Sequence, residues 1–126
     1  MDVGIASESR KFQIIPALLD SGANATSIDK AVAEQMGLPL EALMNPIRVF
    51  NMDGSRNLAG DVTHAVNIMV DFRGHREELH AEVTNLGKNS LILSYMWLKK
   101  HNPSIDWEKG SVRFNRCPRS CLMLQD

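Results

Sequence analysis

Cysteine is scarce in this chain. Only Cys117 and Cys121 occur among 126 residues, and both lie near the C-terminal end. A secreted domain that is stapled by disulfides carries more cysteines, spread through its fold. One Cys-x3-Cys pair without a matching second pair is also a poor zinc motif, although His101 is a conceivable third ligand. We therefore expect neither a disulfide framework nor a metal, and we expect no other cofactor.

The chain also lacks a large net charge and long apolar runs. Its 14 basic residues nearly balance its 15 acidic residues, which gives a net charge of -1. No strong field therefore draws the protein to nucleic acid or to an anionic membrane. No apolar stretch reaches the length of a signal-peptide core or of a membrane span. From these absences we expect an intracellular, cytoplasmic protein with neither nucleic acid nor membrane as a partner.

The length allows one domain but not two lobes. A chain of 126 residues can bury a modest core of its own. We find no internal repeat and no low-complexity segment, and the single break in composition follows Phe114. We therefore expect one domain over residues 1–114 and a tail over residues 115–126.

Most of the chain has the alternation of apolar and polar residues that is typical of strands. Single strands are predicted over residues 12–19 and 91–93. One hairpin is predicted from strands 47–51 and 58–70 with a turn at 52–57, and an antiparallel pair from strands 66–72 and 79–83 with a turn at 73–75. A closing hairpin is predicted from strands 105–107 and 111–114. Pro16 interrupts the first strand, so we expect it at an edge or a bulge. The fold is therefore predicted to be mainly β.

Two short helices complete the predicted fold. The first is marked by apolar residues at helical spacing, namely Ile28, Ala31, Val32 and Met36. Thr26 or Ser27 can cap this helix at its start, and Gly37 can end it. The second helix is predicted over residues 95–101, with Ser94 as its cap.

The most informative stretch is Asp20-Ser21-Gly22-Ala23, which directly follows the apolar run at residues 14–19. This order places one carboxylate in a tight turn at the end of a buried strand. Gly22 lets the backbone turn closely under this carboxylate, where a Cβ would collide. Two carboxylates that share one proton can hydrolyse a peptide bond without a metal or a covalent nucleophile. Asp-Ser-Gly is also ordinary turn chemistry, so a plain loop remains open at this point. Since one Asp-Ser-Gly is present, a second copy of the chain would have to supply the second carboxylate.

The order of these elements resembles the retropepsin family, and most closely the Pol-encoded protease of gypsy-type LTR retrotransposons. The resemblance is carried by the strand that leads into Asp20-Ser21-Gly22-Ala23, a short helix, a long hairpin, Leu91-Ile92-Leu93-Ser94, Trp97-Leu98-Lys99-Lys100-His101-Asn102-Pro103, Asp106-Trp107 and Cys117-Pro118-Arg119-Ser120-Cys121. It covers residues 12–121, nearly the whole chain. It implies a closed β-barrel of the acid-protease type, a homodimer, a polyprotein substrate, and a tail that leads toward downstream polyprotein.

The resemblance also implies roles for individual residues. Asp20 would be the catalytic carboxylate, in an active-site loop that contains Ser21, Gly22 and Ala23. The residues implied in substrate binding are Asn24, the flap residues Met52, Asp53, Gly54 and Ser55, and the pocket residue Ile92. An ordinary surface hairpin at 52–57 and a core strand residue at 92 are the alternatives.

One position departs from the family pattern. Ser94 stands where retropepsins usually have glycine, beside the predicted catalytic turn. Its hydroxyl would either crowd the Asp20 turn or cap the following helix. The alternative to an active endopeptidase is therefore a weakened or inactive retropepsin-like module that dimerises or binds peptides.

Overall fold

The computed structural model describes residues 1–6, 11–48, 60–72, 75–117 and 122–123, and all statements below concern these residues. Eight strands form one sheet, in the order β10-β6-β3-β7-β2-β1-β5-β4. Their bounds are β1 Asp2–Ala6, β2 Gln13–Leu19, β3 Ser27–Asp29, β4 Glu41–Ile47, β5 Val62–Phe72, β6 His75–Thr84, β7 Leu91–Leu93 and β10 Leu122–Met123. A separate hairpin joins β8 Ser104–Asp106 to β9 Ser111–Arg113.

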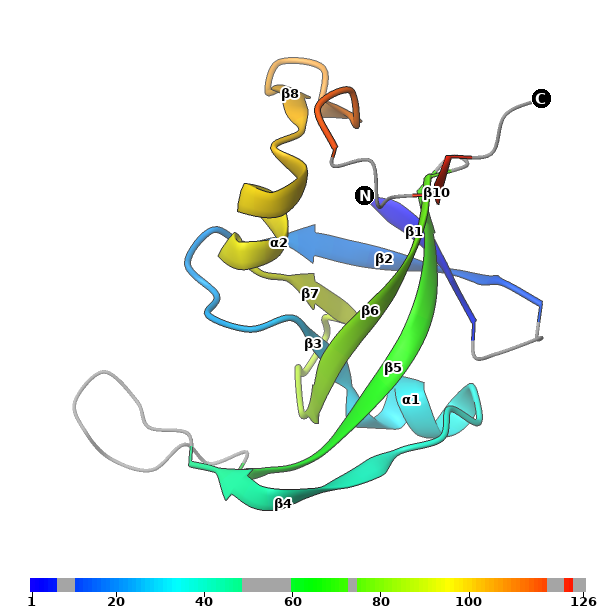
Figure 1. Ribbon diagram of the computed structural model, residues 1–126, viewed down its shortest axis with the longest axis vertical. Coiled ribbons are helices and arrows are strands. Elements are labelled where there is room, and N and C mark those ends of the chain that lie inside the picture. Colours follow the sequence, from blue (N-terminus) through cyan, green and yellow to red (C-terminus); the bar gives the residue numbers. More distant parts are fainter. Residues whose placement is uncertain (7–10, 49–59, 73–74, 118–121, 124–126) are drawn as a thin grey trace.

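The sheet closes on itself. Because β5 also pairs with β6, the six strands β6, β3, β7, β2, β1 and β5 form a closed barrel, and β4 and β10 extend it. Figure 1 shows the long strands β5 and β6 side by side, with the helix α2 (Tyr95–His101) in the upper half of the view and α1 (Lys30–Gln35) in the lower half. The predicted mainly β, closed-barrel fold with two short helices is confirmed.

The barrel core follows from the alternation in the sequence. Along β5 and β6, buried residues alternate with half-buried or exposed ones, as expected for strands with one face on a core. The side chains with no exposed surface are those of Ile5, Ile28, Val70, Leu91, Leu93, Ala33, Ala81 and His101. β1, which contributes Ile5, was not predicted, because five residues next to a polar segment carry little periodicity.

Pro16 lies in β2, which is an inner strand between β1 and β7 rather than an edge strand. The prediction of an edge or a bulge is therefore wrong. The strand tolerates Pro16 because Ala17 exchanges hydrogen bonds with Met1, so the nitrogen of Pro16 faces the β7 side. Pairing with β7 begins only at Ala17, one residue later. The missing N–H of Pro16 therefore removes no bond between β2 and β7.

The start of α1 also differs from the prediction. Ile28 belongs to β3, and Asp29 rather than Thr26 or Ser27 is the cap, since its carboxylate accepts a hydrogen bond from the Val32 N–H. The other carboxylate oxygen of Asp29 accepts from the Leu86 N–H at 2.9 Å. Gly37 follows the helix with a φ of 65°, a left-handed conformation that suits glycine.

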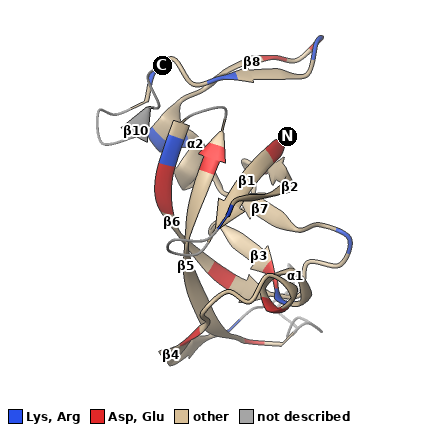
Figure 2. Ribbon diagram, turned by 90° about the vertical axis from the view of Figure 1, so that its right-hand side faces the viewer, with Lys and Arg blue, Asp and Glu red and all other residues tan. Residues whose placement is uncertain are grey.

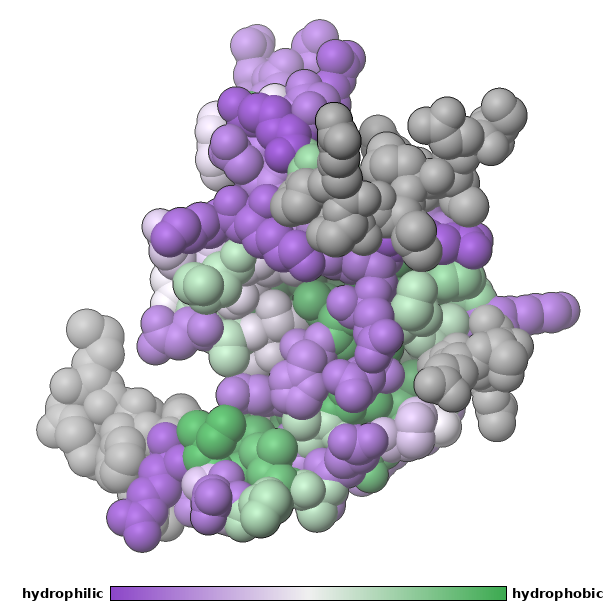
Figure 3. Space-filling model, in the orientation of Figure 1, coloured by the Kyte–Doolittle hydropathy of each residue, from purple (hydrophilic) through white to green (hydrophobic). Residues whose placement is uncertain are grey.

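The antiparallel pair β4 and β5, in which Ile47 lies opposite Val62, flanks the predicted turn at residues 52–57. However, β4 covers residues 41–47 rather than the predicted 47–51, of which 49–51 lie outside the described residues. The turn itself, with Met52, Asp53, Gly54 and Ser55, lies outside the described residues. Figure 3 shows apolar atoms gathered over β4, where Met44 is 98% exposed and Ile47 is 42% exposed.

Charge is spread over the described surface. Figure 2 shows basic and acidic residues interspersed along the ribbon. Within the described part of the chain, neither helix has the length and apolar character needed to cross a membrane.

Candidate active site

The Asp20 loop, residues 20–24, begins where β2 ends. The Asp20 N–H donates a hydrogen bond to the Leu93 carbonyl at 3.0 Å, which fixes the start of the loop against β7. The Ala23 N–H then donates to the Asp20 carbonyl at 3.1 Å, which closes a tight turn. Because Asp20 is only half-buried, solvent can still reach this residue. Its backbone, in contrast, is held to the barrel by these hydrogen bonds.

The Asp20 carboxylate is oriented from within its own turn. The Gly22 N–H donates a hydrogen bond to Asp20 Oδ1 at 2.9 Å. A Cβ on Gly22 would lie 3.3 Å from the same oxygen, closer than ordinary van der Waals contact. Glycine at position 22 therefore allows the close approach through which the backbone holds the carboxylate.

The far side of the Asp20 loop is held by the start of α2. The Tyr95 N–H donates a hydrogen bond to the Ala23 carbonyl at 3.1 Å. This N–H belongs to the first residue of α2 and has no partner inside the helix. The loop is thus fixed by backbone bonds to β7 at one end and to α2 at the other, which limits how far the Asp20 carboxylate can move.

Below the loop, the buried residues Thr26 and Ser94 hydrogen-bond to each other. Thr26 Oγ1 donates to Ser94 Oγ at 3.2 Å, and the Ser94 N–H donates to Thr26 Oγ1 at 3.3 Å. Ser94 Oγ in turn accepts from the Trp97 N–H at 3.3 Å and caps α2. Of the two readings of Ser94, the structure shows the cap.

Ile92 and Leu18 form a small apolar surface beside Asp20. They are register partners on the parallel strands β7 and β2, one residue before Leu93 and Leu19. The neighbours Leu91 and Leu93 are fully buried, whereas Ile92 is half-buried and Leu18 is 44% exposed. Because side chains alternate along a strand, Leu18 and Ile92 point away from the barrel core. The sequence indicated Ile92 but not Leu18, although alternation along β2 carried the signal.

The remaining residues expected at the site are open to solvent. Ser21, Gly22 and Asn24 are exposed, and Ala23 is half-buried. The expected flap residues 52–55 lie outside the described residues, so they stay a prediction.

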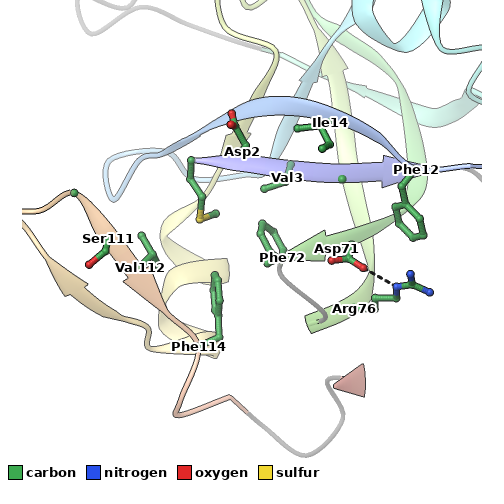
Figure 4. Close-up of a pocket in the computed structure, with 13 residues that line it drawn as sticks. Asp2, Val3, Phe12, Ile14, Asp71, Phe72, Arg76, Ser111, Val112 and Phe114 are labelled. Carbon is green, nitrogen blue, oxygen red and sulfur yellow. Dashed lines mark hydrogen bonds and ion pairs between the residues drawn. The ribbon is translucent and has the colours of Figure 1, made fainter. Parts of the chain in front are cut away.

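A cavity lined by described residues lies away from the Asp20 loop. It has a volume of about 540 Å³ and lies between β1, the start of β2, the ends of β5 and β6, and β9 (Figure 4). Asp71 and Arg76 form an ion pair on its wall at 2.7 Å. None of its lining residues belongs to the Asp20 loop.

Asp20 is not part of a metal-binding cluster in the described chain. Only one group of three His, Cys, Asp or Glu side chains converges there, and it consists of His75, His101 and Cys117.

Comparisons with known proteins address the family and the fold of the chain. A family model described as the PEG10/RTL1 protease domain matches residues 16–121. The chain is similar to the retroviral protease-like domain of Ddi1 from Leishmania major, with 19% identity, a TM-score of 0.63, and coverage of 98% of this chain and 93% of that one. It is also similar to EIAV protease complexed with the inhibitor HBY-793, with 16% identity, a TM-score of 0.51, and coverage of 84% and 89%. These likenesses confirm the predicted retropepsin-like fold.

Proposed function

The chain belongs to the PEG10/RTL1 protease domain family, and from this membership we propose that it is an aspartic endopeptidase that works as a homodimer. Asp20 is the catalytic carboxylate of each copy. The observation that carries the proposal is the Asp20 turn, where the Gly22 N–H orients the carboxylate and backbone bonds to Leu93 and Tyr95 fix the loop. Such preorganisation is what a catalytic group requires.

The proposed chemistry uses two Asp20 carboxyl groups that share one proton. The ionised group takes a proton from a water molecule, whose oxygen attacks the carbonyl carbon of the peptide, while the protonated group gives its proton to the carbonyl oxygen. The tetrahedral intermediate then breaks its C–N bond as the nitrogen takes a proton from the pair and one hydroxyl of the intermediate returns a proton to the pair. The products are a carboxylic acid and an amine.

Exposed apolar side chains around the Asp20 loop support a second copy as the partner. Leu18 is 44% exposed, Tyr95 51% and Met96 61%. Tyr95 and Met96 form the start of α2, which holds the loop. A two-fold contact at this face would cover such side chains and bring the two Asp20 residues together. In it, the exposed hydroxyl of Ser21 would bond across the dimer.

The substrate in this proposal is an extended segment of polyprotein. Gly22, Ala23 and Asn24 would contact its backbone, and Leu18 with Ile92 would form the wall of a side-chain pocket. The residues 52–55 would close over it as a flap, adding strand-like contacts and excluding water.

The test compares the wild-type chain with Asp20→Asn and with the control Asp106→Asn. Asparagine keeps an oxygen that can accept from the Gly22 N–H, so Asp20→Asn is expected to fold and dimerise normally while cleavage of a denatured polyprotein is lost. Asp106 is the exposed last residue of β8, directly before the turn to β9, and its variant is expected to cleave like the wild type. Sedimentation measured in the same buffer reports the dimer.

Mixing the two chains tests whether each dimer needs both carboxylates. At a fixed wild-type concentration, an equal amount of Asp20→Asn chain should reduce cleavage to about half, because half of the wild-type subunits then sit in mixed dimers. Unchanged cleavage would show that one chain acts alone. A wild-type dimer that binds peptides without cleaving them would instead support the noncatalytic module.

A further inference from the structure

Three side chains that are common metal ligands meet beside the end of α2. His75 starts β6, His101 is the last residue of α2, and Cys117 follows β9. His75 is 1% exposed, His101 has no exposed surface, and Cys117 is half-buried. One ligand atom from each residue lies within 4.8 Å of the other two.

The distances in this cluster match those between ligands of a tetrahedral metal. Cys117 Sγ lies 3.4 Å from His101 Nδ1 and 3.5 Å from His75 Nδ1. With Zn–S of about 2.3 Å, Zn–N of about 2.0 to 2.1 Å and tetrahedral angles, sulfur and nitrogen ligands stand about 3.5 Å apart. The two imidazole rings pack in a T-shaped arrangement, with centroids 5.0 Å apart.

A buried carboxylate sets the orientation of His101. Glu77 Oε1 lies 2.9 Å from His101 Nε2 and accepts a hydrogen bond from Trp97 Nε1 at 2.6 Å. Lys100 Nζ lies 3.5 Å from the second oxygen of Glu77. A proton on His101 Nε2 would face this carboxylate and would leave the lone pair of His101 on Nδ1, the atom that faces Cys117. Metal-binding histidines commonly have such a carboxylate behind them.

We propose that His75 Nδ1, His101 Nδ1 and Cys117 Sγ bind a Zn²⁺ ion. Two imidazoles and one thiolate are typical ligands of zinc. Cys117 loses its thiol proton to solvent when the Zn–S bond forms, and the negative charge of Glu77 offsets the charge that remains. Water can fill the fourth position. The site is separate from Asp20 and does not depend on the proposed protease activity.

This site differs from the one that the sequence offered. The sequence indicated only His101 as a partner for Cys117 and Cys121, and no metal was expected. The fold adds His75, which lies 42 residues from Cys117 in sequence. Cys121 lies outside the described residues and is not part of the proposed site.

Zinc at this position would link Cys117, which follows β9, to β6 and α2 through His75 and His101. Figure 1 shows β10 beside the upper end of β6, where Met123 pairs with His75. Arg116 already hydrogen-bonds to the carbonyls of Asn102 and Pro103, at 2.7 and 3.1 Å. A metal bound only by the folded chain stabilises it in proportion to the logarithm of the metal concentration.

The first experiment titrates the EDTA-stripped, reduced full chain with Zn²⁺ and with Co²⁺. We expect one equivalent of metal per chain and a thiolate-to-cobalt absorption band. Cys117→Ser should lose the band and bind Zn²⁺ at least about 100-fold more weakly, since even an outer partner costs about 10- to 100-fold. Glu77→Gln should keep the band and weaken binding within that range. The control His80→Ala removes an exposed imidazole and should bind as the wild type does.

The second experiment uses the wild-type chain alone, so it does not depend on a variant that folds. Zn²⁺ should slow alkylation of Cys117 by N-ethylmaleimide, as mapped by mass spectrometry. The proposal is overturned if Cys117 is alkylated at the same rate with and without Zn²⁺. It is equally overturned if Cys117→Ser leaves the zinc affinity unchanged, or if no metal binds below millimolar concentration. Cys117 would then be a thiol that hydrogen-bonds to two imidazoles.

Discussion

Replacing Ser94 with alanine tests whether the Ser94 hydroxyl stabilises the fold beside the Asp20 loop or crowds it. The change removes only the hydroxyl and keeps Cβ. The Trp97 N–H then loses its cap, which costs about 1 kcal/mol. The Thr26 hydroxyl also loses its acceptor at a site where Thr26 is 8% and Ser94 is 3% exposed, and an unsatisfied buried donor costs about 1 kcal/mol or more. We therefore expect Ser94→Ala to reduce the free energy of unfolding by about 2 kcal/mol.

Urea and thermal unfolding measure this effect. A loss of about 2 kcal/mol corresponds to a melting temperature lower by about 8 °C in a domain of this size. Thr26→Val should also destabilise the chain, because it leaves the buried Ser94 N–H without an acceptor. The double variant should lose less than the sum of the two single losses, by about 0.5 to 3 kcal/mol. Ser111→Ala, at a half-buried serine on β9, serves as the control.

The opposite result would refute the reasoning. If the Ser94 hydroxyl crowds the Asp20 turn, its removal should relieve strain, and Ser94→Ala should melt at the same temperature as the wild type or above it. Strictly additive losses in the double variant would show that Thr26 and Ser94 do not act as a pair.

Three further outcomes follow from single contacts. Leu18→Ala should lower kcat/KM about 10-fold by removing part of the proposed pocket wall, whereas Ile14→Ala, at a 77% exposed position on the same strand, should leave it unchanged. Asn102→Ala should cost about 1 kcal/mol in urea unfolding, because Asn102 has a φ of 42°, whereas Asn102→Gly should not. Burial raises the pKa of Glu82 and the His80 charge lowers it less, so the folded chain binds this proton more tightly than the unfolded chain. Glu82→Gln should therefore have a larger free energy of unfolding than the wild type at pH 7, and this difference should shrink as the pH falls toward 4.5. A wild type that is more stable than the variant at pH 7 would contradict this. Glu78→Gln, on the same strand, is the control.

The sequence predicted those parts of the fold in which local pattern and tertiary packing agree. Alternation along residues 66–72 and 79–83 predicted the β5–β6 pair, and Ser94 was expected to cap the second helix, as it does. The order of an apolar strand, Asp20 and Gly22 predicted a strand that ends in a tight turn. In each case the signal lies within a few neighbouring residues.

The errors arose where tertiary contacts override local pattern. Ile28 fits the helical spacing of α1, yet it lies in β3 between β7 and β6, which bury it completely. His75 was expected in a turn, yet it is a buried residue of β6. Its contact with Cys117 joins residues far apart in sequence, and no periodicity carries such information.

Helix α2 links the two sites in this domain. Its first residue, Tyr95, holds the Asp20 loop through Ala23, and its last residue, His101, belongs to the proposed zinc site. Seven residues of helix span only about 10 Å. However, the Thr26–Ser94 pair fixes the start of α2 independently, and Asp20 is also bonded to Leu93. Removal of zinc should therefore lower the stability of the fold while the geometry at Asp20 persists, since the contacts that set this geometry do not include the metal ligands.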